Sequence, residues 1–109
     1  MNKEQVQQII NVLGGVRQRP GLYMRQNQAS GFLDGFRLAL EMLSAMGVPT
    51  SFYKEALAER GWEWSLAAPL AEMQQRGLTE EEKVEELLTI EIEAWKKVLA
   101  QIEQPENGQ

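Results

Sequence analysis

The sequence predicts an all-α protein, a single-domain compact bundle of about five helices. Apolar residues recur along most of the chain at the i, i+3, i+4 and i+7 spacing of one helical face. Glycines, prolines and capping residues divide the chain into such helical segments. The alternating pattern of a strand does not occur, apart from an extended Leu22-Tyr23-Met24 that is too short to build a sheet.

The composition is that of one globular domain. Hydrophobic residues make up 43% of the 109 positions and charged residues 25%, as in ordinary soluble proteins. A chain of this length buries roughly two-thirds of the surface that it exposes when unfolded, so we expect one core. We expect a single helical domain over residues 1–104 and a flexible tail over residues 105–109.

Two missing residue types exclude several kinds of site. The chain has no cysteine and no histidine, which removes the usual ligands of zinc, copper and haem and the Ser-His and Cys-His nucleophile pairs. We therefore expect no metal, no cofactor and no catalytic residue. An enzyme of this composition would have to work without metal, through a carboxylate and a tyrosine.

The charge balance indicates which partners suit the chain. Asp and Glu number 16 against 11 Lys and Arg, a formal net charge of -5, whereas nucleic-acid binding relies on a basic face. No apolar run approaches the ~18 residues of a membrane helix, and the first residues lack the pattern of a secretory leader. We expect a cytoplasmic protein that binds neither nucleic acid nor membrane.

The first helix is predicted over residues 2–13. Its apolar face consists of Val6, Ile9, Ile10 and Leu13. Asn2 and Gln5 have the spacing of an N-cap residue and its return partner. Gly14-Gly15 is expected to end the helix, because glycine readily takes the left-handed conformation found just past a helix end.

The second helix is predicted from about Ala29 to Met46. Its wide apolar face consists of Phe32, Leu33, Phe36, Ala39, Leu40, Leu43 and Met46. Arg37 lies on the opposite face, where it can pair with Asp34 and Glu41. Gly35 falls at the margin of the buried face and indicates that another backbone approaches closely there.

The third and fourth helices are shorter. Thr50 or Ser51 is expected to cap the third helix, and Arg60-Gly61 to end it. The apolar stretch 66–73 predicts the fourth helix.

Pro69 leaves the start of the fourth helix open. It lies either in the first turn, where proline is tolerated, or inside a helix that begins at Trp62 and bends at the proline. In both cases Arg76-Gly77 marks the end of the helix.

The last helix has the clearest signals. Residues 79–82 spell a capping box, with three acids that complement the helix dipole. The apolar stripe continues through Val84, Leu87, Leu88, Ile92, Trp95, Val98, Leu99 and Ile102.

Glu91 points into the middle of that stripe. A buried carboxylate must find a cation, gain hydrogen bonds or become protonated. Three interpretations stay open: Glu91 reaches water at the edge of a partly covered helix, it pairs with Arg17 or Arg19, or it is a catalytic carboxylate.

A Pro-Gly turn joins the first two helices. Pro20 pushes Arg19 into extended geometry, and Gly21 permits the positive φ of a type II turn. Leu22 and Tyr23 are then expected to project to opposite sides, so that one of them enters the core. The turn is either a rigid clip between the helices or a binding element.

Several residues of the turn and of an aromatic pair are candidates for binding. Trp62 and Trp64 would lie about 200° apart on a helix, so one core can scarcely bury both, and one is expected at the surface or at an interface. Arginine side chains of the turn suit carboxylates and phosphates. The candidate binding residues are Arg17, Arg19, Tyr23, Trp62, Trp64 and Glu91.

Two resemblances concern the turn. Residues 16–24 are similar to the Val-Arg-x-Arg-Pro-Gly-Met-Tyr-Ile-Gly element of the ATPase subunits of type II topoisomerases, which would imply contact with ATP. We do not adopt this reading, because the match covers only these nine residues and the further nucleotide motifs are missing.

The chain also resembles a loose group of small bacterial helical proteins with an Arg-Pro-Gly-Met-Tyr-Leu-Gly turn, a Phe/Leu-x-x-Gly-Tyr-like segment, a Gly-Trp element and an acidic last helix. The matching segments here are 19–23, 32–36, 61–62 and 80–93. Some members of the group look like immunity proteins that bind and block a bacterial toxin. The resemblance implies a helical fold and a protein partner.

The function expected from the sequence is that of a small acidic protein-interaction module. It would be an immunity-type or adaptor protein that binds a bacterial protein, for example a toxin. The alternatives are a structural homodimer and the metal-independent enzyme described above.

Overall fold

The computed structural model describes residues 2–24, 29–44, 48–63 and 68–103, and every regular element within them is a helix. The elements are α1 (Lys3–Gln18), the 3-10 helix η1 (Pro20–Leu22), α2 (Ala29–Ser44), α3 (Thr50–Glu59), α4 (Ala68–Gln75) and α5 (Glu80–Glu103). The predicted all-α fold is thus confirmed. The predicted tail, residues 105–109, lies outside the described residues.

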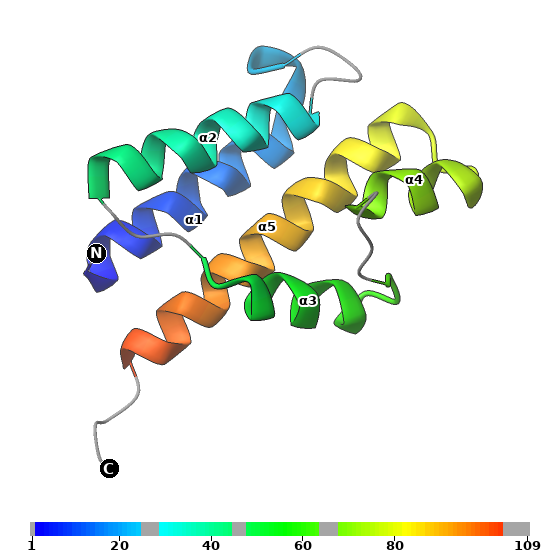
Figure 1. Cartoon of the computed structure of the whole chain (residues 1–109). Coiled ribbons are helices and arrows are strands. Elements are labelled where there is room, and N and C mark those ends of the chain that lie inside the picture. Colours follow the sequence, from blue (N-terminus) through cyan, green and yellow to red (C-terminus); the bar gives the residue numbers. More distant parts are fainter. Residues whose placement is uncertain (1, 25–28, 45–47, 64–67, 104–109) are drawn as a thin grey trace.

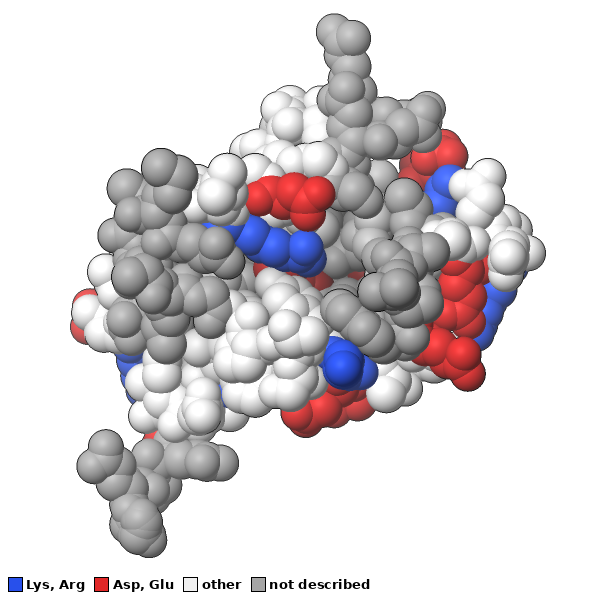
Figure 2. Space-filling view, viewed as in Figure 1, with Lys and Arg blue, Asp and Glu red and all other residues white. Residues whose placement is uncertain are grey.

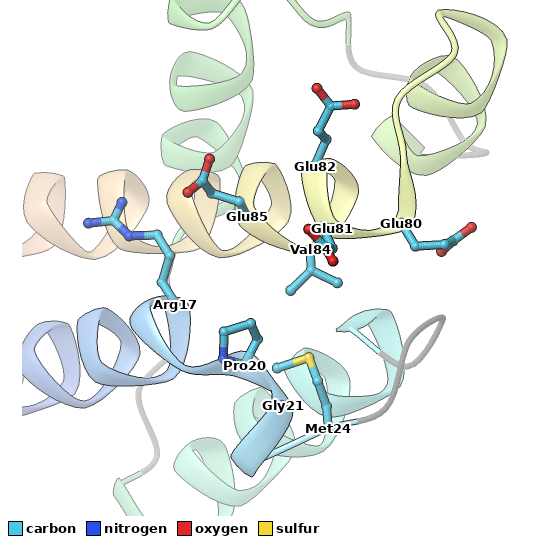
Figure 3. A pocket seen from close by; sticks show the side chains of 9 residues that line it. All are labelled: Arg17, Pro20, Gly21, Met24, Glu80, Glu81, Glu82, Val84 and Glu85. Atoms are coloured by element: carbon cyan, nitrogen blue, oxygen red, sulfur yellow. The ribbon is translucent and has the colours of Figure 1, made fainter.

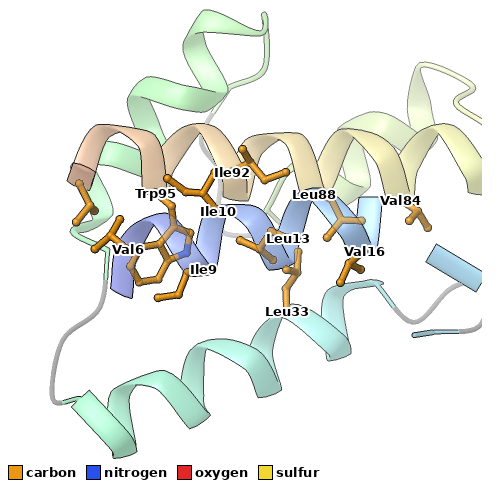
Figure 4. Packing of buried hydrophobic residues seen from close by; sticks show 11 residues of the cluster. Val6, Ile9, Ile10, Leu13, Val16, Leu33, Val84, Leu88, Ile92 and Trp95 are labelled. Carbon is orange, nitrogen blue, oxygen red and sulfur yellow. The ribbon is translucent and has the colours of Figure 1, made fainter. Parts of the chain in front are cut away.

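Helix α5 runs through the middle of the molecule, with α1 and α2 on one side and α3 and α4 on the other (Figure 1). The main hydrophobic cluster lies between α1, α5 and α2, where Ile9, Leu13 and Leu33 meet (Figure 4). A smaller cluster holds α3 and α4 against the opposite side of α5 and consists of Ala56, Leu57, Trp62, Met73 and Ile90. The stripe predicted on the last helix therefore does face a core, and Ile90 adds a second apolar face.

Helix α1 starts as predicted and ends later than predicted. The side chain of Asn2 accepts from the backbone N–H of Gln5, and the Gln5 side chain accepts from that of Asn2, each at 2.9 Å. The helix continues through Gly14-Gly15 in helical conformation. The expected end at these glycines is therefore wrong. Each glycine costs up to about 1 kcal/mol in a helix, and burial of Val16 at 1% exposure offsets this cost.

The Pro-Gly turn differs from the predicted type II turn. Arg19 leaves the helical region, with φ -136° and ψ 64°, but Gly21 has no positive φ and the chain forms η1 instead. The backbone carbonyl of Pro20 accepts from the N–H of Tyr23 at 2.9 Å and from that of Met24 at 3.0 Å. These bonds satisfy backbone groups that an isolated extended segment would leave unpaired, which explains why the extended geometry does not form.

The side chains of the turn are also arranged differently than expected. Leu22 is 72% exposed and Tyr23 is 54% exposed, so neither enters the core. Met24 packs against the main cluster instead. The expectation that Leu22 or Tyr23 would be buried is wrong. In a 3-10 helix successive side chains do not alternate between two opposite sides, as they do in an extended segment.

Helix α2 uses a narrower apolar face than predicted. Leu33 is buried, while Phe32, Phe36 and Leu40 are half-buried against the main cluster. Ala39 and Gly35 are exposed. A Cβ atom on Gly35 would meet no atom within 4 Å, so the expected close backbone approach is wrong. Of the predicted face, Leu43 and Met46 lie outside the described side chains, as does Glu41.

Helices α3 and α4 end as predicted, at glycines with φ +82°. At Gly61 and again at Gly77 the glycine N–H and the following N–H donate back into the last turn, which satisfies carbonyls left free at a helix end. The start of α3 differs, because Pro49 is its N-cap and no side chain caps it, so Thr50 or Ser51 does not have the predicted role. Pro69 lies in the first turn of α4, one of the two positions left open.

Helix α5 begins with the predicted capping box. Thr79 Oγ1 accepts from the N–H of Glu82 at 3.1 Å, and Glu82 Oε1 accepts from the N–H of Thr79 at 2.8 Å. None of the helices in the described ranges combines the length and the apolar character that crossing a membrane requires.

The course of α1 predicts that Gly14→Ala and Gly15→Ala stabilise the protein. Both positions are helical and a Cβ atom at either would meet no atom within 4 Å, so each substitution should raise the free energy of unfolding by about 0.5–1 kcal/mol. Gly61→Ala is the control, because its positive φ makes alanine cost roughly 1–2 kcal/mol. Urea denaturation measures all three, and a loss of stability in the α1 variants would contradict the helical course.

Candidate functional site

Glu91, in the middle of α5, is fully buried at 0% exposure and receives hydrogen bonds from three side chains. Arg37 of α2 donates from Nε to Oε1 at 3.0 Å and from Nη2 to the same oxygen. Oε2 accepts from the Tyr53 hydroxyl at 2.6 Å and from Trp95 Nε1 at 3.0 Å. The carboxylate thus joins α2, α3 and α5. Figure 2 shows basic and acidic side chains together between α2 and α3.

The structure corrects two interpretations of Glu91. The side chain does not reach water, because none of its surface is exposed. Its cation is Arg37 rather than Arg17 or Arg19. Arg17 donates to Thr89 Oγ1 at 3.1 Å, and Arg19 is exposed. The signal for the true partner was that Arg37 is the one basic residue of the predicted second helix.

Arg37 lies at the boundary between the Glu91 cluster and the surface. Its Nη1 is 3.5 Å from Asp34 Oδ1, so this predicted pair is confirmed. Its guanidinium also stacks 4.8 Å from the centre of the Tyr53 ring. Burial, together with the charge of Glu91, raises the pKa of the Tyr53 hydroxyl, so the hydroxyl stays protonated and donates to the carboxylate. These contacts engage both oxygens of the Glu91 carboxylate and give it a structural role between three helices.

Trp62 is at the centre of a second polar cluster. Its ring is buried, and its Nε1 donates to Glu86 Oε2 at 2.7 Å. Arg60 donates two hydrogen bonds to the same carboxylate, of 2.6 and 2.7 Å. The guanidinium of Arg76 lies 4.4 Å from the centre of the Trp62 ring. The structure therefore places Trp62 inside the molecule, whereas Trp64 lies outside the described residues.

The charge of Glu86 is favoured by these donors. The hydrogen bonds from Arg60 hold the pKa of the Glu86 carboxyl below its usual value, against the opposing effect of burial, and Trp62 adds to the lowering. The cluster thereby ties residues 60–62, which follow α3, to α5.

A groove of about 850 Å³ lies between the Pro-Gly turn and the start of α5 (Figure 3). Its lining residues are Arg17, Pro20, Gly21, Met24, Glu80, Glu81, Glu82, Val84 and Glu85. The side chains of Pro20, Met24 and Val84 face one another and form an apolar floor (Figure 3). The remaining side chains that line the groove are charged.

Two of the four glutamates at this groove are engaged by the protein itself. Glu80 pairs with Lys83 at 2.7 Å. Glu82 closes the capping box, and its side chain points away from the floor in Figure 3. Glu81 and Glu85 are exposed and make no hydrogen bond or ion pair within the described ranges. Glu81 lies next to Val84, whereas the Glu85 side chain, like that of Glu82, points away from the floor in Figure 3. Both are exposed, so their carboxylates are open to a ligand.

The groove brings together only part of the predicted site. Arg17 lines it, and the exposed Tyr23 lies within the turn that forms one wall, next to Met24. Glu91 and Trp62 belong to the separate polar clusters described above. The prediction missed Glu81 and Glu85, although a signal existed: neither has a basic residue three or four positions away on the helix.

Within the described residues, no group of three or more acidic side chains is arranged to hold a metal ion. No protein-family model, curated protein or solved structure matches this chain. The resemblance to the small bacterial helical proteins thus stays a prediction.

The Glu91 cluster predicts a large loss of stability for Arg37→Leu. The variant leaves a buried carboxylate without its cation, which should cost about 3 kcal/mol. Asp34→Asn is the control, because its exposed pair with Arg37 should contribute less than about 0.5 kcal/mol. Chemical denaturation at pH 7 measures both. Equal losses in the two variants would mean that Arg37 does not hold Glu91.

The Glu86 cluster predicts a pH-dependent contribution to stability. Because the folded-state pKa of Glu86 is lowered, the stabilisation is present above the unfolded-state pKa of about 4.3 and is lost as the pH falls through the lower folded-state value. Glu86→Gln should therefore lower the free energy of unfolding at pH 7, and the difference from the unmodified protein should shrink below about pH 4.

The control for this pH series is Glu93→Gln, which removes an exposed pair with Lys96 on the same helix. Its effect should be small at both ends of the series. Urea denaturation curves between pH 3 and 7 give the values. A Glu86→Gln difference that stays constant in acid would contradict the ion pair.

Proposed function

We propose that this chain is a small protein-interaction module that binds a basic segment of a partner protein in the groove between the Pro-Gly turn and α5. One observation carries the proposal: Glu81 and Glu85, which make no hydrogen bond or ion pair within the described ranges, line the same groove as the apolar floor. Such a groove suits a lysine or arginine side chain, whose methylene stem covers apolar surface while its charged end meets the carboxylates.

The surroundings of the groove support a macromolecular partner. Leu22 and Tyr23, exposed at 72% and 54%, extend the apolar surface beyond the groove along the turn. The net charge of -5 would steer a basic partner toward the molecule.

In the cell, this module would act as the immunity-type or adaptor protein that the sequence predicts. A module of this kind needs a recognition surface and no chemistry of its own. The structural role of Glu91 supports binding over the enzyme alternative, because its hydrogen bonds already come from three neighbouring side chains.

The proposal predicts selective binding of a lysine-containing peptide. The probe is acetyl-Ala-Lys-Pro-Leu-Gln-Ala-amide, compared with the same peptide carrying Glu in place of Lys. Amide NMR signals of Met24, Val84 and Glu85 should shift on titration with the lysine peptide only. The double variant Glu81→Gln/Glu85→Gln should bind about tenfold more weakly, because two charge-assisted contacts are lost.

The matched control is Glu4→Gln/Glu63→Gln, which removes the same charge from two exposed glutamates outside the groove. It should bind like the unmodified protein at low salt. Equal binding of the two peptides, or an equal loss in both double variants, would reduce the effect to net charge and overturn the proposed site.

A further inference from the structure

Along the groove, acidic side chains are followed by a basic one. Glu81, Glu85 and Thr89 follow one another at intervals of four residues on α5, so they lie along one face of the helix. Arg17 of α1 donates to the hydroxyl of Thr89. The acidic part of the face is therefore followed by a guanidinium, which also lines the groove.

Arg17 has unused hydrogen-bonding capacity. A guanidinium carries five N–H donors, and the contact with Thr89 uses one of them. Within the described part of the chain, Arg17 has no carboxylate partner. Thr89 is buried at 9% exposure, so its hydroxyl is a fixed anchor that holds the guanidinium in place at the groove.

We propose that the groove selects a segment carrying one basic and one acidic side chain, the basic one bound by Glu81 and Glu85 and the acidic one by Arg17. This inference rests on the proposed function and adds the chemistry of the partner segment. A segment with only basic side chains would place a cation against Arg17, which is unfavourable. An acidic side chain there would gain a fork of two N–H donors.

The helix geometry gives the spacing of the two charges. The midpoint between Glu81 and Glu85 lies six positions before Thr89, or about 9 Å along the axis at 1.5 Å per residue. A polyproline II segment has three residues per turn and rises about 3.1 Å per residue, so residues i and i+3 lie on one side about 9 Å apart. An apolar residue between them would lie over Val84.

The experiment changes one side chain in the peptide, Gln to Glu, and one side chain in the protein. Acetyl-Ala-Lys-Pro-Leu-Glu-Ala-amide, with its charges at i and i+3, is compared with the Gln-containing peptide by NMR titration. The unmodified protein should bind the Glu-containing peptide about three- to fivefold more tightly. Arg17→Gln should remove this preference.

Arg19→Gln is the matched control, because Arg19 is exposed and close in sequence but does not line the groove. It should keep the preference. Thermal unfolding checks that Arg17→Gln still folds, and Arg17→Lys, which keeps the charge and loses the planar fork, should keep only part of the preference.

The outcomes separate the two proposals. If both peptides bind the unmodified protein equally, or the preference survives Arg17→Gln, Arg17 only clips α1 to α5 and the inference is overturned while the proposed function stands. If neither peptide shifts the groove signals, the proposed function fails together with the inference.

Discussion

The carboxylate of Glu91 has no exposed surface, and this constraint determines how α2, α3 and α5 meet. A charge taken out of water is tolerated only with a cation and hydrogen bonds around it. Here the donors come from all three helices, through Arg37, Tyr53 and Trp95. Helix α2 buries Leu33 and packs Phe32, Phe36 and Leu40 against the main cluster. Arg37 adds a polar contact that joins α2 to α5.

The groove depends on a different feature, the length of α1. Because α1 continues past Gly14-Gly15 to Gln18, the Pro-Gly turn comes to lie beside the first turns of α5. A helix ending at Leu13 would leave Arg17 in a connecting segment rather than on the helix that faces Thr89. The two glycines do not interrupt the helix despite their cost, and burial of Val16 favours its course past them.

Local signals in the sequence were sufficient for most of the helices. Capping residues and apolar periodicity predicted α5, and the glycines with positive φ predicted the ends of α3 and α4. The misplaced charge of Glu91 was visible as well, but its partner Arg37 is 54 positions away, where no local rule reaches. The groove was likewise beyond prediction, because it exists only once η1 and the start of α5 lie side by side.

The Arg37–Glu91 contact also bears on how this sequence can diverge. A substitution at either position leaves the other charge without its partner. Descendants of the chain are therefore expected to keep both residues, or to replace both together by apolar ones of similar volume. Tyr53 and Trp95 would accompany the first outcome, since each donates to the same carboxylate. An arginine in the second helix, a tyrosine in the third and Glu-x-x-x-Trp in the last thus form a signature by which distant kin could be recognised.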